Sequence, residues 1–197
     1  MNDIICKQKS ERDFLLLEWM RSYLPKDIIT QVEQTMRASP DRITSAYEEL
    51  LSGYGERIDD HLSVAATYDQ GSYKGYVSAL KIPFSSFCMH HLLPYSGTVD
   101  VVYRPNELIL GLGKIARIIG TLSKRFQIQE HLAKEIAEGM DCLTKGCGTF
   151  VSISAVHCCV CNRGPLAHGS TNVVTYATGE LAEVKSQAQL ANVMIGK

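Results

Sequence analysis

The chain has 197 residues, 45% of them hydrophobic, which is enough to bury the core of one domain. Its formal net charge of −1 argues against bulk nucleic-acid binding, because that function usually needs a surplus of Lys and Arg. The apolar runs are much shorter than a membrane-spanning helix, and the N-terminus lacks the order of a secretory signal, so we expect a cytoplasmic protein without a membrane partner. The cysteines are then expected to be reduced thiols or metal ligands.

The N-terminal part has the periodicity of helices. Apolar residues recur at helical spacing over residues 11–37, and Pro25 divides this run into two predicted helices. Ser39 precedes a proline and an acid, an order typical of a helix start, so we predict Ser39 as the N-cap of a third helix that ends at Gly53. The sequence therefore predicts an N-terminal helical region over residues 1–55.

A polar stretch with weak periodicity, residues 56–75, is the predicted linker to a β-rich domain over residues 76–197. The elements expected in that domain are strands at 76–87 and 97–103, helices at 114–126 and 129–143, strands at 149–156 and 171–177, and a short helix at 181–193. This order predicts an α+β domain with its helices on one face of the sheet.

Cysteine and histidine gather in two short segments, residues 86–94 and 155–164. In these segments Cys88, His91 and Cys159 could supply three ligands of the kind that zinc prefers, and a fourth position would stay open as in catalytic zinc sites. The alternative is that the cysteines are small buried hydrophobic residues and the histidine an ordinary polar residue. Spacing alone leaves both interpretations open.

Two further histidines, His90 and His157, lie next to these candidate ligands and could carry protons near neutral pH. Together with a metal they would outline a hydrolytic site, whereas the alternative is that both lie on the surface. Cys158 and Cys161 flank Cys159 at what would be alternating strand positions. They could compete for the metal or oxidise with Cys159.

Charged and polar residues at two helix starts are candidates for binding an anionic ligand. Lys114 and Arg117 lie one turn apart near a helix N-terminus, which suits a phosphate, and Arg163 adds a third local positive charge. Gln129 and Glu130 begin the next helix, where a carboxylate could accept two hydrogen bonds from a guanine-like edge. The alternative for each set is an ordinary solvated helix face or helix start.

These segments, in this order, resemble the GTP cyclohydrolase I family over roughly residues 39–179. The motifs that carry the resemblance are Ser-Pro-Asp-Arg at 39–42, Cys-x-His-His-Leu-Leu-Pro at 88–94, the segments 111–117 and 127–132, and the segment 157–164. The resemblance implies the tunnelling fold, a four-stranded antiparallel sheet with two helices inserted between its second and third strands. It also implies a homodecamer of two stacked pentamers, with active sites between subunits.

The resemblance further implies a reaction and a role for each site residue. GTP would lose formate on hydrolytic opening of its imidazole ring and give 7,8-dihydroneopterin triphosphate, the entry to folate or biopterin. The implied roles are Zn²⁺ binding by Cys88, His91 and Cys159, proton transfer by His90 and His157, guanine binding by Gln129 and Glu130, and triphosphate binding by Lys114, Arg117 and Arg163.

Two residues depart from the family pattern. Met89 stands where members usually carry an acid, and Gly113 stands where they usually carry Ser before the triphosphate lysine. These departures leave open a divergent enzyme that acts on another purine nucleotide or stops after ring opening. A further alternative is a non-catalytic purine-binding protein in which the metal is structural, although such a protein has no need of two histidines beside the metal.

Overall fold

The computed structural model describes residues 9–62, 73–106 and 108–183. The chain divides into two compact units, Met1–Leu51 and Ser52–Lys197. The predicted linker, residues 56–75, falls partly on residues 63–72, which lie outside the described residues, so the predicted domain boundaries stay predictions. Within the described ranges, every helix is too short or too polar to cross a lipid bilayer.

Helices make up the described part of the N-terminal unit, as the periodicity predicts. They are α1 (Lys9–Met20), α2 (Lys26–Ala38) and α3 (Arg42–Leu50). Pro25 occupies the residue before α2, which confirms the predicted break, because a proline ring cannot continue a helix but suits its start. Leu17, Ile29 and Met36 are buried together and form the small apolar core of this unit.

The predicted start of the third helix is wrong. Helix α3 begins at Arg42, and the residue before it is Asp41, whose backbone is left-handed with φ of 65° and whose side chain makes no capping hydrogen bond. Ser39 instead ends α2, because its backbone N–H donates to the carbonyl of Met36. Ser39 therefore lies in the short turn between α2 and α3, and it is not the N-cap of α3 that the motif predicted.

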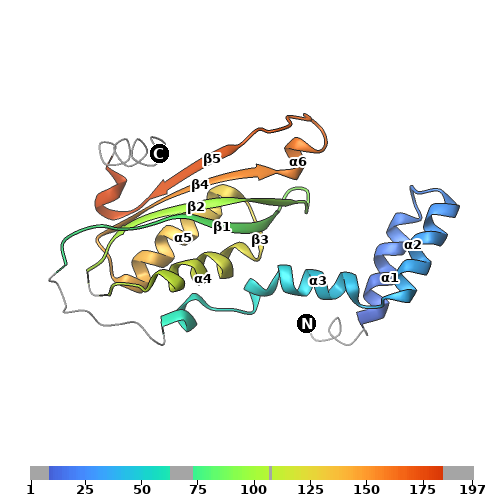
Figure 1. Ribbon diagram of the computed structural model, residues 1–197, viewed down its shortest axis with the longest axis horizontal. Helices are drawn as coiled ribbons and strands as arrows, with labels where there is room; N and C mark the ends of the chain where they lie inside the picture. Colours follow the sequence, from blue (N-terminus) through green and yellow to red (C-terminus); the bar gives the residue numbers. More distant parts are fainter. Residues whose placement is uncertain (1–8, 63–72, 107, 184–197) are drawn as a thin grey trace. The chain divides into compact units, whose positions relative to one another are not determined.

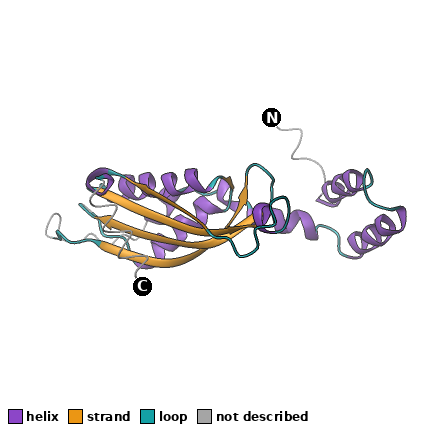
Figure 2. Cartoon of the chain, turned by 90° about the horizontal axis from the view of Figure 1, so that it is seen from above, coloured by secondary structure: helices purple, strands orange, loops and turns teal. Residues whose placement is uncertain are grey.

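The second unit is built on a sheet with helices on one face, which confirms the α+β class (Figures 1 and 2). Its four long strands are antiparallel neighbours in the order β1 (Val77–Cys88), β2 (Pro94–Arg104), β4 (Gly148–His157) and β5 (Asn172–Ala177). Helices α4 (Leu112–Ser123) and α5 (Gln129–Thr144) lie between β2 and β4 in the chain, as predicted. The predicted C-terminal helix at 181–193 lies mostly outside the described residues, which end in a short 3₁₀ turn, Gly179–Ala182.

The prediction of a purely antiparallel four-stranded sheet needs a correction. A fifth strand, β3 (Phe126–Gln127), lies between α4 and α5 and pairs in parallel with Phe87 and Cys88 of β1. The sheet is therefore mixed, in the order β3-β1-β2-β4-β5. A strand of this length shows no alternation of apolar and polar residues, so periodicity cannot reveal it.

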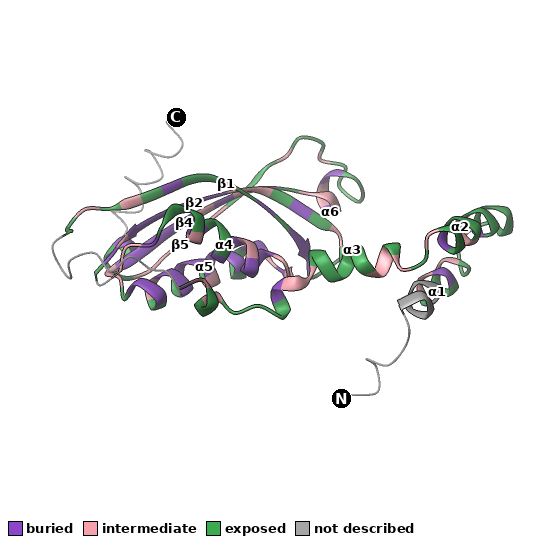
Figure 3. Ribbon diagram, turned by 60° about the horizontal axis from the view of Figure 1, so that its bottom comes forward, coloured by how far each residue is buried: buried purple, intermediate pink, exposed green. Residues whose placement is uncertain are grey.

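Helices α4 and α5 bury their apolar faces against the sheet (Figure 3). Residues with no exposed surface in this core include Ile115, Ile118, Ile119, Leu132, Ile136, Val99, Val101 and Ile153. Tyr103 of β2 is also fully buried, and its hydroxyl accepts a hydrogen bond of 3.0 Å from the backbone N–H of Leu110. That bond satisfies a donor in the loop that leads into α4.

A 3₁₀ turn, Ile58–Leu62, packs against α4 before the first strand. The hydroxyl of Thr121 donates to the carboxylate of Glu56 at 2.6 Å, and Nε2 of His61 lies 2.9 Å from the same hydroxyl oxygen. The hydrogen bond from Thr121 lowers the pKa of Glu56, against the opposing effect of burial. This small polar network links the segment to α4.

Candidate active site

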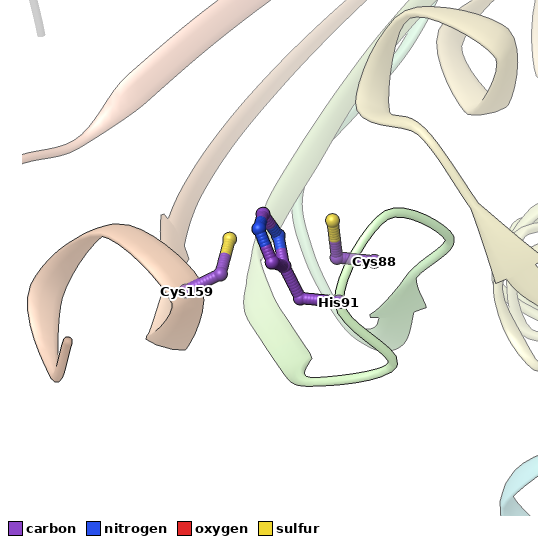
Figure 4. A group of neighbouring side chains, drawn as sticks. All are labelled: Cys88, His91 and Cys159. Carbon is purple, nitrogen blue, oxygen red and sulfur yellow. The ribbon is translucent and has the colours of Figure 1, made fainter. Parts of the chain in front are cut away.

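The metal-ligating residues predicted from the sequence come together at one end of the sheet. Cys88 is the last residue of β1, His91 lies in the turn before β2, and Cys159 lies in α6 (Cys158–Cys161), directly after β4. Since β1 and β4 both pair with the start of β2, the fold places these segments side by side. The two sulfur atoms and a ring nitrogen of His91 lie within 4.8 Å of one another, with the imidazole between the thiols (Figure 4).

This set of donors fits a zinc ion. Two thiolates and an imidazole are ligands that zinc prefers, and three protein ligands leave a position for a further ligand. Cys88 and Cys159 are buried, and burial, with the neighbouring Cys88 thiol, raises the pKa of Cys159. A cation at this point would reverse that effect by stabilising the thiolates.

The neighbouring thiols are placed differently from the prediction. Cys158 to Cys161 form one helical turn, so they do not occupy alternating strand positions. The sulfur of Cys161 is buried and lies 3.8 Å from the carbonyl oxygen of Ser170, while the metal-ligating group among the described residues includes neither Cys158 nor Cys161. Competition of these two thiols for the metal stays a prediction.

A cavity of about 440 Å³ adjoins the metal-ligating group. Besides the three candidate ligands, it is lined by His90, His157, Gln129 and Glu130. The structure thus brings together the predicted metal, proton-transfer and guanine-binding residues, although the chain separates their segments. The apolar part of the lining includes Ile128, Val160, Val173 and Val174.

The side chain of Gln129 joins α5 to two strands. It is 3% exposed, and its amide nitrogen donates to the backbone carbonyls of Ile153 and Asn172, at 2.9 and 3.1 Å. Its amide oxygen lies 2.8 Å from Nε2 of His157. Both amide hydrogens of Gln129 therefore have acceptors within the chain.

Tyr95 is a site residue that sequence analysis did not identify. Its ring stacks on the imidazole of His157, with 4.4 Å between ring centroids and 4° between planes. Burial raises the pKa of Tyr95 to about 12, so its ring stays uncharged. Burial also lowers the pKa of His157, while the charge of Glu130 acts in the opposite direction. The only signal in the sequence was the position of Tyr95 four residues after His91.

The second histidine, His90, lies beside the candidate metal ligands. Nδ1 of His90 is 3.8 Å from the sulfur of Cys88, and the centroids of the His90 and His91 rings are 6.3 Å apart. His90 is exposed, and so is Glu130, which also lines the cavity. Two groups that can exchange protons or accept hydrogen bonds are thus accessible to a ligand.

The predicted phosphate-binding cations lie apart from one another. Arg163 follows α6, and its charge opposes the rise in the pKa of Cys159. Lys114 is in the first turn of α4 and Arg117 is near its middle; α4 follows β2 and precedes β3 in the chain, and its 12 residues span about 18 Å. Lys114 donates there to the backbone carbonyl of His61, and neither it nor Arg117 is among the described residues that line the cavity.

An α+β unit that gathers two thiols, an imidazole, further histidines and a carboxylate around one cavity has the make-up of a metal-dependent hydrolase. The sequence model of GTP cyclohydrolase I matches residues 23–195. GTP cyclohydrolase 1 of Rickettsia bellii is 41% identical over 145 residues, which are 74% of this chain and 75% of that protein. The enzyme of the same name from Rickettsia prowazekii is 40% identical, over 74% and 76% of the two chains.

The chain therefore belongs to the GTP cyclohydrolase I family and is an enzyme of that family, which confirms the resemblance found in the sequence. Among solved structures, an archaeosine synthase QueF-like protein in its apo form aligns with 55% of this chain and 97% of its own, at 17% identity and a TM-score of 0.44.

Proposed function

We propose that this enzyme opens the imidazole ring of GTP by hydrolysis, releases formate and forms 7,8-dihydroneopterin triphosphate. The observation that carries the proposal is the cavity in which the Cys-His-Cys group, two histidines and a carboxylate meet. Membership of the family supports GTP as the substrate. The cavity volume, about 440 Å³, falls in the range of small-molecule sites.

Each residue of the cavity would have a distinct part in this reaction. Cys88, His91 and Cys159 would hold Zn²⁺, which when bound supplies Lewis-acid chemistry and a nucleophilic water near neutral pH. His90 and His157 would give and take the protons of ring opening and of the later rearrangement of the sugar. The family resemblance assigns guanine to Gln129 and Glu130 together.

Among these, Glu130 is best placed to recognise the base. Its carboxylate is exposed in the cavity and could accept two hydrogen bonds from the N–H edge of guanine. Glu130 lies in the first turn of α5.

Triphosphate binding would need more than one chain. The charge of Arg163 acts on Cys159 at the cavity of its own chain, whereas Lys114 and Arg117 lie about 14 and 9 Å along α4 before its end at Ser123, and neither is among the described residues that line that cavity. We therefore assign Lys114 and Arg117 to the cavity of a neighbouring subunit in a homodecamer. Support comes from β1 and β5, because within the described part of one chain β5 has an unpaired edge and β1 pairs with β3 only at Phe87 and Cys88.

The experiment is GTP turnover by purified, zinc-loaded protein, with formate and pterin fluorescence followed in the same sample. We expect both products from the wild type and neither from His90→Ala. His131→Ala is the matched control, since His131 is exposed on α5 and does not line the cavity, and it should keep both. Binding of GTP without any product from zinc-replete wild type would contradict the proposal.

A second candidate function is the opening of a related purine nucleotide, or a reaction that stops after ring opening. Two observations favour it: Met89 is 52% exposed beside the candidate metal ligands, and a Cβ at Gly113 would meet, among the described residues, no heavy atom within 4 Å apart from its chain neighbours and the backbone of its own helix, so the hydroxyl that Ser would supply there is missing from open space. Formate without pterin would support the truncated reaction. Turnover of another purine nucleotide, shifted toward GTP by Gly113→Ser, would support the changed substrate.

A further inference from the structure

We infer that Gln129 is a positioning residue for His157, and that it holds the neutral imidazole as the tautomer with its proton on Nε2. The catalytic meaning of this inference rests on the proposed function, because His157 is there a proton-transfer group. The tautomer itself follows from hydrogen bonds within the chain and can be measured without any substrate.

The first step is the orientation of the Gln129 amide. Two backbone carbonyl oxygens, of Ile153 and Asn172, lie 2.9 and 3.1 Å from one end of the amide. Carbonyl oxygens only accept hydrogen bonds, so the group that faces both must be the NH₂. A flipped amide would place its oxygen against two other oxygens in a site that is 3% exposed, where unpaired polar atoms are costly.

The second step passes this orientation to the imidazole. With the NH₂ fixed, the amide oxygen of Gln129 faces Nε2 of His157 at 2.8 Å. An amide oxygen has no proton to donate, so Nε2 must carry the hydrogen of this bond. A neutral imidazole has one ring proton, and Nδ1 of His157 is then the nitrogen with the lone pair.

The third step fixes the plane of the ring. Tyr95 lies parallel to the imidazole at 4.4 Å and is itself 1% exposed. Phe84 packs edge-on against Tyr95, with ring centroids 5.7 Å apart, and so limits its movement. The stack restricts tilting of the imidazole, while the bond to Gln129 restricts its rotation within the plane. Nδ1 of His157 is therefore a preoriented proton acceptor.

This arrangement gives Gln129 a different role from the one that the family resemblance implies. Its two amide hydrogens and its oxygen already have partners, whereas Glu130 is exposed in the same cavity. Loss of the Gln129 amide should therefore slow turnover more than it weakens GTP binding. Loss of the Glu130 carboxylate should do the reverse, and this contrast separates positioning from base recognition.

The experiment combines ¹⁵N NMR of histidine-labelled, zinc-loaded protein with steady-state kinetics. We expect the His157 signals, assigned by their loss in His157→Ala, to report a protonated Nε2 in the wild type at a pH where the ring is neutral. In Gln129→Met, which keeps the length of the side chain without the amide, that signature should give way to a mixture of tautomers. The kcat should fall about 10- to 100-fold with KM for GTP changed less than about threefold.

Tyr95→Phe and Glu130→Gln are the controls. The first keeps the stacked ring and should keep the tautomer, and the second should raise KM for GTP without changing the tautomer. A protonated Nδ1 in the wild type would overturn the inference, even if Gln129→Met fails to fold. A raised KM with unchanged kcat in Gln129→Met would overturn the positioning role. If the protein does not turn over GTP, the proposed function fails, and the NMR result still decides the tautomer.

Discussion

Two buried tyrosines of the same strand should respond in opposite ways to the loss of a hydroxyl. Tyr103 of β2 has no exposed surface, and its hydroxyl accepts the N–H of Leu110, which is 2% exposed. In Tyr103→Phe this N–H keeps its apolar surroundings and loses its acceptor. We expect the free energy of unfolding to fall by about 1–3 kcal/mol, the cost of leaving a buried donor unpaired.

Tyr95→Phe is the matched variant. Tyr95 is 1% exposed, and its hydroxyl makes no well-formed hydrogen bond within the described part of the chain, although the nearby Ser86 hydroxyl opposes the effect of burial on its pKa. Removal of a buried hydroxyl without a good partner should cost nothing, or stabilise the fold by up to about 1 kcal/mol. The rings against Phe84 and His157 stay in place.

Urea unfolding of the wild type and the two variants, followed by circular dichroism at one protein concentration, measures both effects. The concentration must be fixed because assembly adds to apparent stability. Equal slopes of free energy against urea would show that the variants unfold to the same extent. An equal loss of stability in the two variants would refute the reasoning, because it would mean that the bond to Leu110 contributes nothing beyond the burial of the hydroxyl.

Three further predictions concern packing, pH and metal. Gly97→Ala should lower the free energy of unfolding by at least about 2 kcal/mol, and the thermal midpoint with it, because the new Cβ would lie 1.9 Å from the carbonyl oxygen of Ser154 on the next strand. Gly120→Ala, in open space on α4, should instead stabilise the fold. The hydrogen bond from Thr121 lowers the pKa of Glu56, so its ionised form stabilises the fold above the ordinary carboxyl pKa. That stability is lost as pH falls through the lowered value, and unfolding of Glu56→Gln should therefore depend less on acid pH. A chelator should lower the thermal midpoint and added zinc restore it, whereas no change on chelation would contradict the metal site.

Long elements with strong periodicity could be predicted from the sequence, and short ones could not. The predicted strand at 149–156 corresponds to β4 (Gly148–His157), and the predicted helix at 129–143 corresponds to α5 (Gln129–Thr144). Each is long enough for its apolar residues to recur several times at the spacing of a strand or of a helix. The prediction for Ser39 was wrong because serine is favoured both as a helix N-cap and in the turn that follows a helix. β3 has too few residues for any pattern.

Part of the candidate site could also be predicted from the sequence, and part of it could not. Cys88, His91 and Cys159 could be proposed together because their residue types and motif order are distinctive. The stack of Tyr95 on His157 depends on the register of β2 with β4, where these two residues are direct partners. No spacing in the sequence specifies that register, and none shows that Lys114 and Arg117 are absent from the described residues that line the cavity.

The register of β4 with β5 affects how long the Gln129 amide keeps both of its backbone acceptors. Asn172, whose carbonyl holds one amide hydrogen of Gln129, belongs to the terminal pair of that ladder, opposite Ala155. Edge strands fray at their ends at a fraction of the cost of global unfolding. Each such opening releases one anchor of the amide while β4 keeps the other, at Ile153. A neighbouring chain that pairs with β5 would suppress these openings, so assembly would lengthen the lifetime of the ordered imidazole without touching it.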